Sequence, residues 1–103
     1  MRFRVIVMPV AEGDIAGIIR YIADVLGNKN AALEHYDAFC RALESLEEMP
    51  DRNPISGLEV LNERGIRLIP VGNYVIMYSV LEDEGVVEVY RVLYGRMDLE
   101  RKV

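Results

Sequence analysis

The sequence is poor in the residues on which most small metal and catalytic sites depend. It has one cysteine, Cys40, and one histidine, His35, in 103 residues. A single cysteine cannot close an intramolecular disulfide, and these two residues do not supply a cysteine-ligated or histidine-rich metal site. Neither a glycine-rich phosphate loop nor a nucleophile elbow is present. We therefore expect no metal and no cofactor, and the sequence gives no support for nucleotide hydrolysis or serine hydrolase chemistry.

Long apolar runs and excess positive charge are missing as well. No apolar run approaches the ~20 residues of a membrane span. Pro9 interrupts the N-terminal segment before a signal-like region develops. We expect a cytoplasmic protein that does not enter a membrane. The net charge of −5 is opposite to the basic surface that tight nucleic-acid binders usually carry.

Length and composition predict a single globular domain over residues 1–103. Hydrophobic residues make up 51% and charged residues 28% of the chain, the balance of an ordinary folded protein. A chain of this size forms one core and buries roughly two-thirds of its unfolded surface.

Periodicity in the first half predicts a strand followed by two helices. Residues 3–7 alternate in the period of a strand with one buried face, which Pro9 ends. From Ala11, isoleucines recur every three or four residues as on one face of a helix, with Asp14 near the positive end of its dipole. Asn30 is the expected cap of a second helix, packed against the first as a hairpin. Its predicted apolar stripe is Ala32, Tyr36, Phe39, Leu43 and Leu46.

The second half predicts three strands, at Gly65–Val71, Tyr74–Leu81 and Val86–Tyr94. Short turns between them favour consecutive antiparallel hairpins. In the last strand Val87 and Val89 share one phase and Val92 the other, so either both faces are covered or a bulge shifts the register. The predicted fold class is α+β: an antiparallel sheet with an N-terminal strand, a two-helix hairpin on one face and a C-terminal three-strand meander. The position of the first strand stays open.

Tyrosines on the last two strands are the first candidates for function. Tyr74 and Tyr78 share a face of one predicted strand, and such pairs usually stabilise a sheet. Tyr94 differs because it ends the last strand, directly before Gly95 and Arg96.

Five short patterns together resemble the RelE/ParE toxin superfamily, of the plasmid stabilisation type, from about Phe3 to Leu99. They are Ala11-x-x-Asp14-Ile15-x-x-Ile18-x-x-Tyr21-Ile22, then Leu46-x-x-Met49-Pro50, Gly65-x-Arg67, Asn73-Tyr74-x-Ile76-x-Tyr78-x-Val80, and Val89-x-Arg91-Val92-Leu93-Tyr94-Gly95-Arg96-x-Asp98. The resemblance implies a toxin neutralised by a co-expressed antitoxin, whose C-terminal segment wraps the toxin in an oligomeric complex.

Two kinds of target follow from the resemblance. RelE-like members cut messenger RNA at the ribosome with clustered basic residues and a tyrosine or histidine near the C-terminus. ParE-like members inhibit DNA gyrase without that catalytic set. On the RNA-cleaving interpretation the catalytic residues here are Arg67, Arg91, Tyr94 and Arg96.

Departures from the RNA-cleaving pattern favour gyrase. Ile66 and Leu68 flank Arg67 where those members place basic residues, and Val75 stands where they place an arginine. Metal-free RNA cleavage needs preorganised cations and a group that transfers protons. The main prediction is therefore a non-enzymatic gyrase inhibitor that binds its target through Tyr94, Arg96 and Arg101. The alternatives are a ribosome-dependent mRNA endoribonuclease and an inactive relative that only binds its antitoxin.

Overall fold

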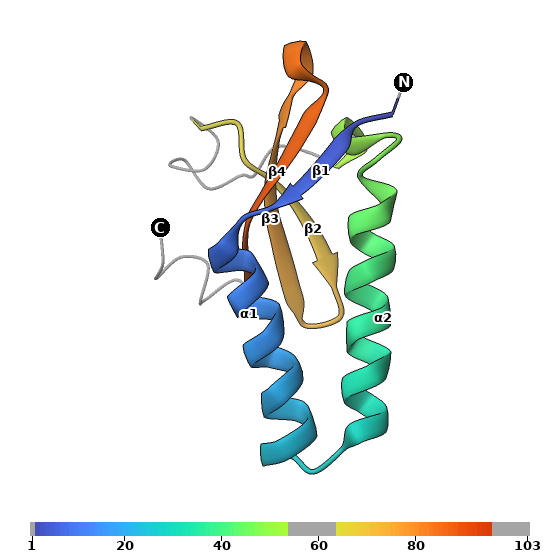
Figure 1. The fold of residues 1–103 in the computed structure, drawn as a ribbon, viewed down its shortest axis with the longest axis vertical. Coiled ribbons are helices and arrows are strands. Elements are labelled where there is room, and N and C mark those ends of the chain that lie inside the picture. The colour runs from blue at the N-terminus through green and yellow to red at the C-terminus, as the bar shows by residue number, and fades with distance from the viewer. Residues whose placement is uncertain (1, 54–63, 96–103) are drawn as a thin grey trace.

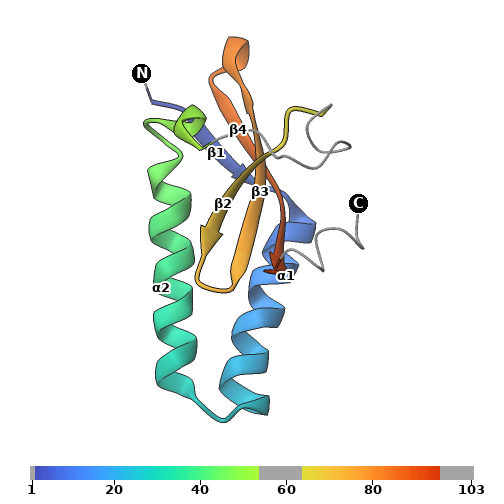
Figure 2. The same cartoon turned by 180° about the vertical axis from the view of Figure 1, so that it is seen from behind.

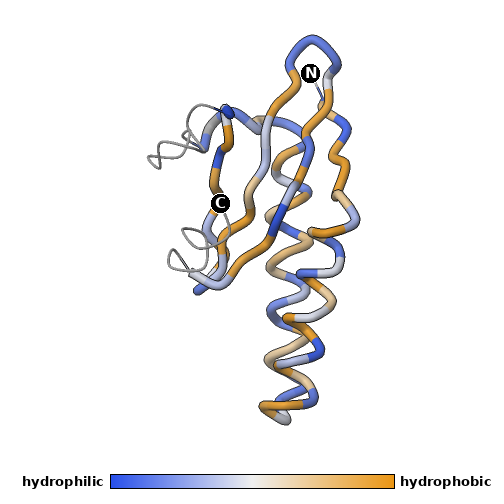
Figure 3. Tube along the Cα trace, turned by 90° about the vertical axis from the view of Figure 1, so that its left-hand side faces the viewer, coloured by the Kyte–Doolittle hydropathy of each residue, from blue (hydrophilic) through white to orange (hydrophobic). Residues whose placement is uncertain are grey.

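The computed structural model describes residues 2–53 and 64–95, whose elements form two layers (Figure 1). Seen edge-on, the sheet lies on one side and both helices on the other (Figure 3), and Figure 2 shows the molecule from behind. In chain order the elements are β1 (Arg4–Val7), α1 (Pro9–Arg20), a π-helical turn (Tyr21–Val25), α2 (Lys29–Ser45), a 3-10 turn (Pro50–Arg52), β2 (Arg67–Val71), β3 (Tyr74–Leu81), a 3-10 turn (Glu82–Glu84) and β4 (Val86–Tyr94).

The four strands lie in the order β1-β4-β3-β2. The predicted α+β class and the C-terminal meander are confirmed, but the sheet is mixed rather than wholly antiparallel. β1 runs parallel to β4, with Arg4 opposite Val86 and Val7 opposite Val89. Tight turns fix the directions of β2, β3 and β4, whereas no hairpin turn constrains β1, which two helices separate from the meander.

A bulge in β4 explains the phase change among its valines. Met77 of β3 pairs with Arg91 and Tyr78 pairs with Val89, so Tyr90 has no partner in β3. The extra residue shifts by one position the alternation of β4 side chains between the two faces of the sheet. Val87, Val89 and Val92 consequently all belong to the core cluster beneath the helices.

Both helices begin at positions other than those predicted. α1 begins at Pro9, two residues before Ala11, because a proline at the first helical position leaves no broken hydrogen bond. Asp14 therefore lies beyond the first turn, which contains only Glu12 as an acidic residue. The cap of α2 is Asn28 rather than Asn30: its side chain accepts a hydrogen bond from the Ala31 N–H at 3.0 Å. Asn30 already lies inside the helix.

The main core lies between the sheet and the helical hairpin, around Phe39, Leu46 and Tyr78. A smaller cluster of Ile66, Met77 and Leu93 covers part of the opposite face of the sheet. The predicted stripe of α2 is correct except at Tyr36, which is 49% exposed, because the two helices leave a groove between them that Tyr36 lines.

The helical hairpin extends past the sheet at one end of the molecule, and the β3–β4 hairpin extends at the other (Figure 1). Among the described residues, no helix is both long enough and apolar enough to cross a membrane.

Candidate functional site

Tyr94 ends β4 directly opposite Tyr74, the first residue of β3. The next residue, Gly95, donates its backbone N–H to the Asn73 carbonyl at 2.8 Å. Gly95 has a φ of +64°, a value that residues with a Cβ rarely adopt. This turn fixes the direction in which the chain leaves the sheet, and it leaves the Tyr94 side chain 55% exposed.

A chain of aromatic contacts supports Tyr94 from beneath. Its ring meets Tyr74 edge-on at a centroid distance of 5.4 Å. Tyr74 in turn contacts Phe39 at 5.7 Å and His35 at 5.9 Å, both from α2. Burial raises the pKa of the Tyr74 phenol, and neighbouring Tyr94 raises it further. The predicted packing role of Tyr74 is confirmed. Tyr94 is the solvent-facing end of this series of aromatic contacts.

Two shallow hollows meet at this aromatic pair. One, of about 420 Å³, is lined by Tyr94 together with Arg91 and the exposed glycines Gly13 and Gly17 of α1. The other, of about 450 Å³, is lined by Tyr94 together with His35 and Asn73. Tyr94 thus stands on a ridge between two depressions, an arrangement that suits insertion into a complementary surface.

The guanidinium of Arg91 is held by Asp14. Its Nε and Nη2 donate to the two Asp14 carboxylate oxygens at 2.8 and 3.0 Å, and the Val92 backbone N–H donates to the same carboxylate at 2.9 Å. The Asp14 hydrogen bond raises the pKa of Arg91. Both charges are partly buried, with side chains 29% and 15% exposed. Asp14 occupies the Nε–Nη2 edge of the Arg91 guanidinium.

Arg67 is also engaged. Its Nη1 donates to the backbone carbonyls of Asp51 at 3.1 Å and Asn53 at 2.6 Å, tying β2 to the segment after α2. Arg67 lies opposite Tyr78, four residues along β3 from Tyr74, which is about 13 Å at the usual rise of a strand.

The structure therefore brings together two of the sequence-predicted site residues, Arg91 and Tyr94, which line the same hollow. It places Arg67 elsewhere on the sheet. Arg96 and Arg101 lie outside the described residues.

Tyr21 belongs to the candidate site by position, and the functional interpretation of the sequence missed it. It is 51% exposed and lines both hollows. Its spacing of seven residues from Asp14 is a signal that could have identified it, because residues two turns apart lie on one face of a helix. The spacing predicts a shared face, but it does not show that this face meets the end of β4.

Three tyrosines, Tyr21, Tyr74 and Tyr94, line both hollows. Across residues 2–53 and 64–95, no three His, Cys, Asp or Glu side chains gather where they could hold a metal ion. Tyrosine carries a large apolar ring and a polar tip, and it is enriched among the residues that dominate protein–protein binding. The geometry fits recognition of a macromolecular surface better than small-molecule chemistry.

Similar folds occur among solved toxin–antitoxin structures. "Chromosomal ParDE TA system from P. aeruginosa" has a TM-score of 0.75 at 13% identity, covering 92% of this chain and 98% of that one. The RelBE2 toxin–antitoxin complex of Mycobacterium tuberculosis gives 0.57 at 16% identity, covering 91% and 99%. The archaeal RelE–RelB complex of Pyrococcus horikoshii gives 0.59 at 16% identity, covering 91% and 96%. No curated protein matches the sequence.

At these identities the structural likeness shows the fold, and the family follows from the sequence itself. Residues 5–99 match the family described as "ParE toxin of type II toxin-antitoxin system, parDE", which is nearly all of the 103 residues. The chain belongs to the ParE toxin family of type II toxin–antitoxin systems.

Proposed function

We propose that this toxin acts in the cytoplasm by binding and inhibiting DNA gyrase, and that a cognate antitoxin holds it inactive. Membership of the ParE family supports the first half. The second half is supported by the similar solved structures, two of which are toxin–antitoxin complexes by title.

The bonds that Arg91 and Arg67 already form favour gyrase over RNA as the target. Arg91 is bound to Asp14, and Arg67 is bound to two backbone carbonyls. RNA cleavage without a metal needs cations poised around the scissile phosphate. Both side chains already hold elements of the fold together, so these two residues support a binder rather than a nuclease.

Tyr94 forms the centre of the proposed target-binding surface. It is exposed at the end of β4 and supported by Tyr74, so little side-chain entropy is lost when it enters an interface. Arg96 and Arg101 follow it in the sequence, and we assign them to the same contact. An arginine fork recognises carboxylates on a protein surface in a directional way.

For the antitoxin, the sequence predicts a segment added to the sheet face away from the helices or to the groove beside it. Ile66, Met77 and Leu93 already cover part of that face. The other candidate is an edge strand, because β2 is an outer strand of the described sheet. Added strands of this kind are a common way for proteins to bind extended peptides.

An RNA-cleaving function is the second candidate, because Arg91 and Tyr94 line the same hollow. Release of Arg91 from Asp14 would place a cation beside the phenol. The two functions give different products, so one pair of assays separates them.

The test measures both activities with the same purified chain. We expect inhibition of gyrase supercoiling at concentrations that leave ribosome-bound message intact, and relief of that inhibition by the antitoxin encoded next to the toxin. Arg41→Ala is the matched control, because Arg41 is exposed on α2 and lines neither hollow. Codon-specific cleavage without gyrase inhibition would replace the proposal with the nuclease.

A further inference from the structure

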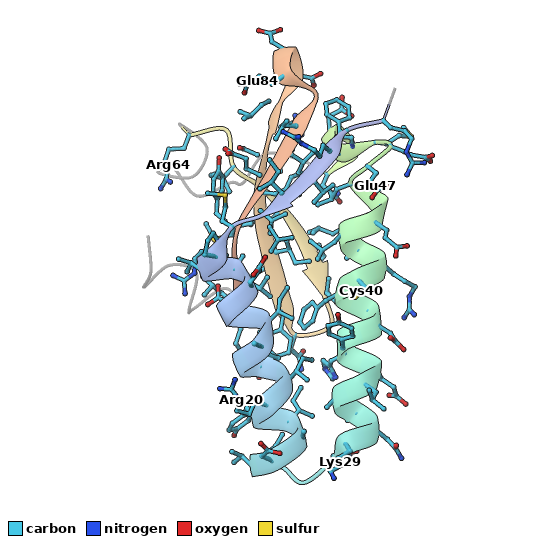
Figure 4. All side chains as sticks on the ribbon, viewed as in Figure 1. Arg20, Lys29, Cys40, Glu47, Arg64 and Glu84 are labelled. Atoms are coloured by element: carbon cyan, nitrogen blue, oxygen red, sulfur yellow. The ribbon has the colours of Figure 1, made fainter. Side chains whose placement is uncertain are left out.

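A groove of about 540 Å³ runs between α1 and α2, and we call it the interhelical groove. Its walls are mainly apolar, with Ala16 and Ile19 from α1 and Tyr36 and Leu43 from α2. Figure 4 marks Arg20 and Cys40, which line it from opposite helices. Tyr36 stays 49% exposed there, so its ring is only partly buried by the described residues.

Two charges of opposite sign line this groove on α1. Glu12 and Arg20 are exposed, and within residues 2–53 and 64–95 neither forms an ion pair. Each is four residues from Ala16, one before it and one after it. Residues four apart form a ridge on a helix surface. Glu12, Ala16 and Arg20 are therefore one ridge, about 12 Å long at the usual rise of a helix.

This ridge is complementary to itself. A twofold axis through Ala16 lays a second α1 across the first in the antiparallel sense. This rotation places Glu12 of each copy opposite Arg20 of the other copy. Ridges of this type pack against each other at about −50°, and a small residue such as alanine at the crossing point lets the backbones approach. Two equivalent ion pairs then flank an apolar contact, as in an isologous interface.

We propose that the chain by itself forms a symmetric dimer in which each α1 packs into the interhelical groove of the other copy. The interface joins the Glu12–Ala16–Arg20 ridges and covers Tyr36. It lies on the helical hairpin and uses neither Tyr94 nor Arg91. A failure of the dimer would therefore leave the proposed action on gyrase unaffected, and the reverse.

Charge reversal tests the symmetry directly. Glu12→Arg sets two arginines against each other at both ends of the interface, and Arg20→Glu does the same with two carboxylates. Each single variant should weaken the dimer by at least about tenfold in Kd, since two attractive pairs become two repulsive ones. The double variant Glu12→Arg/Arg20→Glu restores both pairs with exchanged signs and should dimerise like the wild type. An equimolar mixture of the two single variants should form a heterodimer.

Sedimentation equilibrium of the purified chain gives the readout. Glu34→Arg and Lys29→Glu make equal changes in net charge at exposed positions of α2 outside the groove, and they should leave the dimer unchanged. A wild type that stays monomeric at about 100 µM overturns the proposal, as does a dimer insensitive to the single reversals. A double variant that fails to recover also overturns it, because exchanging the signs of both residues must restore both ion pairs of a symmetric interface.

Discussion

Asp14 of α1 and Arg91 of β4 form a two-pronged ion pair, and the same carboxylate accepts the backbone N–H of Val92. β1 pairs with β4 only as far as Val7 opposite Val89. Beyond that point the Asp14 side chain takes a backbone donor at the edge of β4. One carboxylate thus joins the first helix to the last strand and holds Arg91 in place beside Tyr94.

Asp14→Ala should lower the free energy of unfolding by about 2–3 kcal/mol, because it leaves a partly buried guanidinium and a backbone N–H without their acceptor. Asp14→Asn keeps an acceptor for the N–H and should cost less. Urea denaturation measures both. Asp24→Ala, an exposed carboxylate in the turn after α1, should change stability by less than about 0.5 kcal/mol. Equal effects at the two positions would contradict the structural role of Asp14.

Tyr78→Phe should cost about 1–2 kcal/mol although it removes only one oxygen. The Tyr78 hydroxyl is fully buried. It donates to the Pro50 carbonyl at 2.5 Å and accepts from Asn53 Nδ2 at 3.1 Å, so it links the 3-10 turn after α2 to β3. The matched change Tyr94→Phe, at an exposed ring, should leave stability nearly unchanged. Thermal denaturation of the two variants side by side decides the point.

The sequence predicts the meander closely because its determinants are local. Alternation and short turns define β3 and β4 to the residue, and the valine phase in β4 offered the bulge as one of two explanations. The cap at Asn28 was missed for a local reason too. Asn28 and Asn30 are two residues apart and both suit an N-cap, so residue type alone does not decide between them.

Long-range relations were beyond such patterns. Asp14 and Arg91 are 77 residues apart, and no periodicity links them. The position of β1 beside β4 depends on which edge of the meander it joins, and its own alternation does not distinguish the two outer strands. The exposure of Tyr36 depends on how far two helices diverge, because the same stripe would be fully covered in a tighter hairpin.

Alkaline pH should destabilise the wild type more than the Tyr74→Phe variant. Burial raises the pKa of Tyr74 above its ordinary value of 10.0, so the folded state keeps the phenol protonated where the unfolded chain ionises. The stability contributed by this group is fully present below the unfolded pKa and is lost as pH rises through the folded pKa. Denaturation curves collected between about pH 8 and 11 should diverge only at the alkaline end. Parallel curves throughout would show that Tyr74 is not protected by its neighbours.

The final prediction concerns the proposed target-binding surface. Tyr94→Ala removes an exposed ring whose fixed position comes from Tyr74, so it should reduce inhibition of gyrase by at least about tenfold, as expected of an aromatic anchor at the centre of an interface. Arg96→Ala should abolish toxicity and Arg101→Ala should weaken it, because both remove a cation offered to the target.

The fold must survive these changes if the interpretation is to hold. Tyr94 is more than half exposed, and Asp14 holds Arg91 independently of it, so circular dichroism and antitoxin binding should match those of the wild type. Arg41→Ala, outside both hollows, should keep full inhibition. The conservative variant Tyr94→Phe separates the ring from its hydroxyl: retained inhibition assigns the contact to the apolar ring, and lost inhibition assigns it to the hydrogen bond. Full toxicity in both Tyr94→Ala and Arg96→Ala would place the target contact elsewhere on the molecule.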